Sequence, residues 1–86
     1  MERATDDELM EQTDKWLQRL EAAFSRFEST GRLPDADIDA IRKNIEAYIK
    51  DSGYFREKGD LVRAFEAVVY AWGLLEACQQ LGLVKK

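Results

Sequence analysis

Four carboxylates near the middle of the chain have the spacing of a calcium-binding loop. They occupy positions 1, 3, 5 and 12 of such a loop: Asp35, Asp37, Asp39 and Glu46. The loop also needs a glycine at position 6, and this chain has Ala40 there. Because the dipole of a helix favours negative charge in its first turn, a helix N-terminus explains the same residues. We therefore expect no metal site.

Histidine is absent from the chain, and this removes most of the common catalytic chemistry. Ser–His and Cys–His nucleophile pairs, histidine general bases and nearly all zinc sites need an imidazole. The single cysteine, Cys78, excludes an internal disulfide and lies on an apolar stripe, where a buried thiol is expected. The five glycines are scattered, so no phosphate-binding loop is indicated. The sequence predicts no catalytic, cofactor-binding or metal-binding residue, and hence no enzyme.

The composition is that of one small acidic domain. A chain of 86 residues with 45% hydrophobic and 35% charged residues fits a single folded domain, residues 1–86. The net charge of −4 argues against binding to nucleic acid or to an anionic membrane surface. The longest apolar run, residues 67–75, is too short to span a membrane, and the acidic first ten residues lack the core of a secretory signal. These features predict a cytoplasmic protein.

Three segments repeat apolar residues at steps of three and four, which predicts three helices over about residues 6–29, 36–58 and 60–81. Residues 1–4 are expected to form a frayed end. The fold class is all-α, an antiparallel up-and-down three-helix bundle.

Local signals place the ends of these helices. The only proline, Pro34, separates the first two helices, and so short a connection predicts that they are antiparallel neighbours. Gly59 and Asp60 read as a helix stop followed by an N-cap. Whether Gly53 breaks the second helix stays open. Leu83 and Val84 are expected to fold back onto the bundle.

The third helix has more apolar surface than one packing stripe requires. Its main stripe joins the predicted core, which is Leu20, Phe24, Ile41, Ile45, Phe55, Ala64, Phe65, Val68, Ala71, Trp72 and Leu75. Gly73 lies among large residues, which indicates that a neighbouring backbone or ring approaches it. A second stripe beside it is either covered by the two other helices or left free to bind a partner: Ala67, Tyr70, Leu74, Ala77 and Leu81.

Two functional hypotheses follow. The preferred one is a small protein–protein interaction module, binding an unknown protein or a second copy through Val62, Val69, Tyr70 and Leu74. The alternative is a small-ligand or nucleotide-binding domain with a pocket edged by Tyr48, Tyr54, Lys58, Arg63 and Tyr70.

A set of spaced residues in the second half of the chain supports a family resemblance. The set is Tyr48-x-x-Asp51, Tyr54-Phe55-x-x-Lys58-Gly59-Asp60-x-x-Arg63-Ala64-Phe65, Tyr70-Ala71-x-Gly73-x-Leu75-Glu76 and Leu81-Gly82-Leu83. It resembles the archaeal family called Domain of Unknown Function 357, although Glu76 stands where that family tends towards aspartate. The first helix agrees only in its amphipathic pattern. The resemblance implies an archaeal cytoplasmic three-helix bundle, and it implies no activity.

Overall fold

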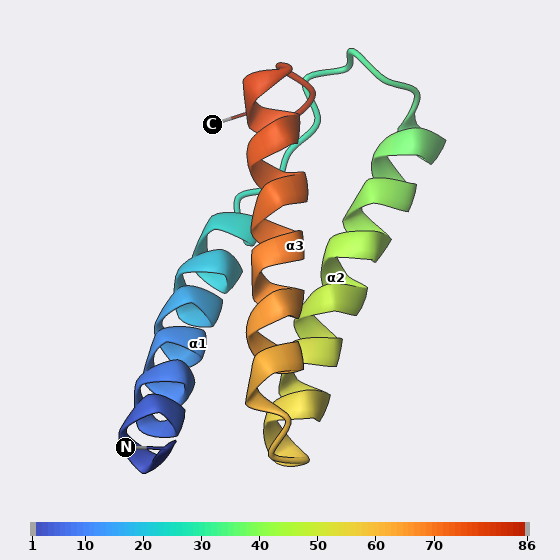
Figure 1. The fold of residues 1–86 in the computed structure, drawn as a ribbon. Helices are drawn as coiled ribbons and strands as arrows, with labels where there is room; N and C mark the ends of the chain where they lie inside the picture. The colour runs from blue at the N-terminus through green and yellow to red at the C-terminus, as the bar shows by residue number, and fades with distance from the viewer. Residues whose placement is uncertain (1, 86) are drawn as a thin grey trace.

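The computed structural model describes the backbone of residues 2–85 and the side chains of residues 6–85. It contains three helices, α1 (Glu2–Phe24), α2 (Asp35–Glu57) and α3 (Leu61–Gln80). In Figure 1, α1 and α3 run in one direction and α2 runs in the other. The all-α, up-and-down three-helix bundle predicted from the sequence is confirmed.

The helices are organised around α3, which packs along both α1 and α2 (Figure 1). The first two helices are antiparallel, as predicted, but they contact each other at few points. The reason is that α3 has the widest apolar arc and can cover both partners, whereas each partner has one narrow stripe. Asp14 on α1 and Arg56 on α2 bridge the gap with two hydrogen bonds of 2.6 and 2.8 Å. This hydrogen bonding and the charge of Asp14 raise the pKa of Arg56.

The core lies where the three helices meet. Its centre is the buried cluster of Leu20, Ile45, Val68, Ala71 and Leu75. Five residues predicted for the core are only half-buried: Phe24, Ile41, Phe55, Phe65 and Trp72. A bundle this small, with extents of 48 × 20 × 16 Å, cannot enclose every large aromatic side chain.

The first helix begins at Glu2 and ends at Phe24, earlier at both ends than expected. After Phe24 the chain leaves the helix, and its backbone pairs with the C-terminal tail through a bridge between Ser29 and Val84. The Thr30 amide donates to the Leu83 carbonyl at 3.1 Å. The expected fraying of residues 1–4 stays a prediction, and Met1 lies outside the described residues.

The tail folds back as predicted, and Val84 is buried in a small cluster with Ile38 and Cys78. The loop between α1 and α2 and the end of α3 are thereby held together at one end of the bundle.

The turn between α2 and α3 has the helix stop and the N-cap that the sequence predicted. The second helix is continuous through Gly53, which answers the question left open above. Gly59 has a φ of 79° and ends the turn after α2, and the Asp60 carboxylate then accepts a bond from the Arg63 amide at 3.2 Å. Close by, the buried hydroxyl of Ser52 donates to the Ala64 carbonyl at 2.9 Å, which ties α2 to the start of α3.

Candidate functional site

The side of α3 that faces away from the core is exposed and mixes apolar residues with Arg63, Glu66, Glu76 and Gln80. We call it the outer face of α3 and define its apolar part by Val62, Val69, Tyr70, Gly73 and Ala77, all exposed to solvent; Glu66 separates Val62 from the other four. Val62 and Tyr70 expose 62% and 58% of their surface, which is high for such large apolar side chains. This face is free because α1 and α2 both lie against the opposite arc of α3.

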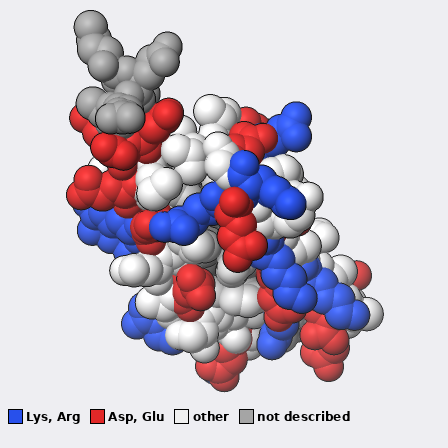
Figure 2. Space-filling model, turned by 90° about the horizontal axis from the view of Figure 1, so that it is seen from below, with Lys and Arg blue, Asp and Glu red and all other residues white. Residues whose placement is uncertain are grey.

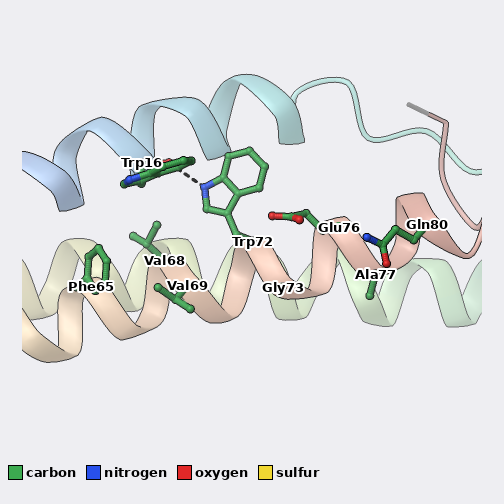
Figure 3. Close-up of a pocket in the computed structure, with 9 residues that line it drawn as sticks. All are labelled: Trp16, Phe65, Val68, Val69, Trp72, Gly73, Glu76, Ala77 and Gln80. Atoms are coloured by element: carbon green, nitrogen blue, oxygen red, sulfur yellow. Dashed lines mark hydrogen bonds between the residues drawn. The ribbon is translucent and has the colours of Figure 1, made fainter.

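A groove between α1 and α3 borders one edge of this face. It holds a cavity of about 460 Å³. Its lining residues from α3 include Phe65, Val69, Trp72, Gly73, Glu76 and Ala77, and Trp16 comes from α1; Figure 3 shows Trp72 reaching from α3 towards Trp16. We call this the α1–α3 groove.

Two tryptophans fix the wall of the α1–α3 groove. The indole N–H of Trp72 donates to the backbone carbonyl of Trp16 at 3.1 Å (Figure 3), and the two rings stand at 89° with centroids 6.1 Å apart. The guanidinium of Arg19 lies over the Trp16 ring, 4.9 Å from its centroid. Perpendicular aromatic packing and a cation over the ring both restrict ring orientation, so this wall is preformed.

The α1–α3 groove continues towards the start of α1. A second hollow of about 240 Å³ is lined by Glu8, Leu9 and Gln12 together with Phe65, which also lines the larger cavity. Across both cavities the ionisable lining residues are the carboxylates Glu8 and Glu76.

The other edge of the outer face is a groove between α2 and α3. Its cavity of about 430 Å³ brings together three of the four residues predicted for an interaction surface, Val69, Tyr70 and Leu74. The fourth, Val62, is exposed on the same helix but lines none of the cavities found in the described part of the chain. Leu74 is half-buried against the core, so it forms the base of this groove.

The residues predicted to edge a ligand pocket are divided by the structure. Tyr48, Arg63 and Tyr70 line one hollow of about 240 Å³ between α2 and α3, together with two carboxylates, Asp51 and Glu66. Two carboxylates beside one guanidinium repel a phosphate group, which does not favour a nucleotide.

Tyr54 and Lys58 do not line that hollow. The Lys58 ammonium instead lies over the Tyr54 ring at 5.6 Å from its centroid. The hypothesis of a ligand pocket therefore stays a prediction. Three of its five residues line one hollow, and the other two lie outside it.

The aromatic α1–α3 groove was not identified from the sequence. Trp72 was assigned to the core, and Gly73 was expected to have a close neighbour. Nothing lies within 4 Å of the place that a Gly73 Cβ would occupy, so the glycine leaves an open notch and that expectation is wrong. The available signal was Trp16, whose position on the first helix matches the apolar period but whose ring is too large for a small core.

Several other chemistries find no support in the described residues. Among these residues, no cluster of three or more His, Cys, Asp or Glu side chains could hold a metal ion. Burial raises the pKa of the Cys78 thiol, so its reactive thiolate form is disfavoured. Figure 2 shows acidic and basic side chains interspersed at the end where α2 meets α3, without a basic patch.

Comparison with known proteins identifies the family. The sequence model of a family described as "Protein of unknown function (DUF357)" matches residues 15–84. The chain belongs to this family. The DUF357 match covers the last part of α1, residues 15–24, and all of α2 and α3. The resemblance described above rested on the second half of the chain, so the match extends further towards the N-terminus.

A solved DUF357 structure, that of protein AF1782 from Archaeoglobus fulgidus, is similar to this chain. The two share 44% sequence identity with a TM-score of 0.81, over 95% of this chain and 97% of the other. The relative is archaeal, as the resemblance implied. A comparison with curated proteins finds no match. Within residues 2–85, no helix has the length and apolar character needed to cross a membrane.

Proposed function

We propose that this DUF357 chain is a non-catalytic protein–protein interaction module that binds its partner through the outer face of α3. The observation that supports it most directly is that Val69 and Gly73 line the grooves on both edges of this face. At Val69 and Gly73, a mainly apolar surface therefore extends from α1 across α3 to α2.

The physical argument rests on what monomeric proteins leave exposed. Large contiguous apolar patches on small folded domains mark binding surfaces, because their contact with water is unfavourable. Aromatic side chains supply much of the binding energy at protein interfaces, and this surface offers Trp16, Trp72, Tyr48 and Tyr70. The notch at Gly73 lets a partner approach the α3 backbone closely.

The test is affinity capture with matched variants. Val69→Asp places a charge at the centre of the outer face, and Ala47→Asp places the same charge on an exposed position of α2 that lines no described cavity. We expect a stoichiometric protein captured from lysate of the source organism to be lost with Val69→Asp and retained with Ala47→Asp. Circular dichroism should show that both variants remain folded.

Two results would contradict the proposal. One is capture that both variants retain equally, which places binding elsewhere. The other is recovery of the bait alone by the wild-type protein at every salt concentration used.

A further inference from the structure

The charges around the α1–α3 groove indicate which charge a partner segment should carry. Neither of its two cavities is lined by a Lys or Arg, and the ionisable lining residues are Glu8 and Glu76. Within the described residues, neither carboxylate takes part in an ion pair. The guanidinium of Arg19, near this wall, is held over the Trp16 ring. The lining of the groove is therefore mainly apolar, with the amides of Gln12 and Gln80 and with one carboxylate in each cavity that makes no ion pair.

The positions of Glu8 and Glu76 along the groove suit a helical partner. Glu8 shares a hollow with Phe65, and Glu76 lies further along α3. At 1.5 Å per residue, the stretch of α3 from Phe65 to Glu76 measures about 16 Å, which is roughly three helical turns. Residues three turns apart on another helix lie on one face, so two cations there would reach both carboxylates.

The shape of the groove also suits a helix. Its lining residues on α3 run from Phe65 to Gln80, or about 22 Å along the axis, the length of about four helical turns. The floor is low at Gly73 and Ala77, and aromatic side chains form the walls. A helix laid along such a groove binds through apolar anchors at steps of three and four residues.

A second copy of this chain fits the groove less well. Each copy carries a net charge of −4 and presents Glu66 and Glu76 on α3, so a two-fold contact between these helices would bring like charges together. Charge complementarity instead favours a basic segment, which the net negative charge would also attract from a distance.

We infer that the α1–α3 groove binds a basic amphipathic helix of a partner protein, with apolar anchors over Gly73 and Lys or Arg side chains about three turns apart facing Glu8 and Glu76. This inference rests on the proposed function, and it adds the chemistry and the place of the partner.

The experiment is a selection of binders from a randomised library of 18-residue helical peptides displayed on phage. We expect the enriched peptides to carry an apolar stripe and basic residues about eleven positions apart. Glu76→Lys should weaken their binding about fivefold or more, because attraction becomes repulsion. Glu57→Lys, on an exposed position of α2 outside the groove, makes the same change in net charge and should have a much smaller effect.

Each other outcome overturns the inference. Enriched peptides without a basic bias, equal effects of Glu76→Lys and Glu57→Lys, or no enrichment all exclude a basic helix in this groove. Dissociation of a dimer by Val69→Asp in sedimentation would identify a second copy as the occupant.

The experiments can refute this inference without refuting the proposed function. If Val69→Asp abolishes capture of a natural partner while Glu76→Lys does not weaken it, the outer face of α3 is a binding surface and only the inferred partner chemistry is wrong.

Discussion

At the scale of single residues, side-chain size decides what a small bundle can bury. Small and branched side chains such as Ala71 and Val68 are enclosed, whereas the rings of Phe65 and Trp72 lie half-exposed at the groove. Cys78 behaves as a small apolar residue, with 4% of its surface exposed. The same burial that makes Cys78 part of a cluster also makes its ionisation unfavourable.

The Cys78 thiol predicts a pH dependence of stability. Because burial raises its pKa above the ordinary value of 9.0, the folded protein holds the thiol proton more tightly than the unfolded chain. Its contribution to stability is therefore complete below pH 9.0 and is lost as the pH rises through the higher pKa of the folded state.

Urea denaturation of the wild type and Cys78→Ala from about pH 8 to about pH 10.5 isolates this effect from other titrating groups. We expect the free energy of unfolding of the wild type to fall relative to that of the variant. A constant difference over this range would show that the thiol is not desolvated.

At the scale of elements, α3 begins where two short-range signals agree. Gly59 adopts the left-handed conformation that ends the preceding turn, and the Asp60 carboxylate accepts a bond from the Arg63 amide at 3.2 Å. Both other helices pack against α3, so a weaker first turn of α3 should lower the stability of the whole bundle.

Removing the cap should therefore be measurable. Asp60→Ala should lower the free energy of unfolding by about 0.5–2 kcal/mol, since the first turn of α3 loses an acceptor. Asp60→Asn keeps an acceptor oxygen and loses only the exposed pair with Arg63 at 3.5 Å, so its effect should stay within about 0.5 kcal/mol. Equal losses for the two variants in urea denaturation would mean that the charge, and not the cap, is what matters.

At the scale of the whole molecule, the short C-terminal tail joins the loop between α1 and α2 to the end of α3. The Lys85 amide donates to the Glu28 carbonyl at 2.8 Å, next to the bridge between Ser29 and Val84. Since α1 and α2 meet at few points, this pairing helps to hold the loop between them against α3.

Val84 is the anchor of that tail. Val84→Ala should cost about 1.5–3 kcal/mol of stability, because a fully buried aliphatic side chain is truncated. The matched control is Leu81→Ala, an exposed position in the same segment, which should change stability by less than about 0.5 kcal/mol. Similar values for the two variants in urea denaturation would show that the tail does not pack as described.

The sequence by itself determined the features that depend on near neighbours along the chain. Three apolar periods define three helices, and Gly59 and Asp60 mark a junction. These signals are local because helical hydrogen bonds and caps connect residues within one or two turns. The four residues proposed for an interaction surface were likewise chosen from the period of one helix.

Only the tertiary structure decided which apolar surface is covered. The second stripe of α3 has the same period as the first, and nothing local predicts that its Ala67 is buried whereas its Tyr70 and Ala77 are exposed. After the early end of α1, the backbone at Ser29 pairs with Val84, in a tail far along the chain. The groove between Trp16 and Trp72 exists because two helices distant in sequence lie side by side, and such contacts leave no period in the sequence.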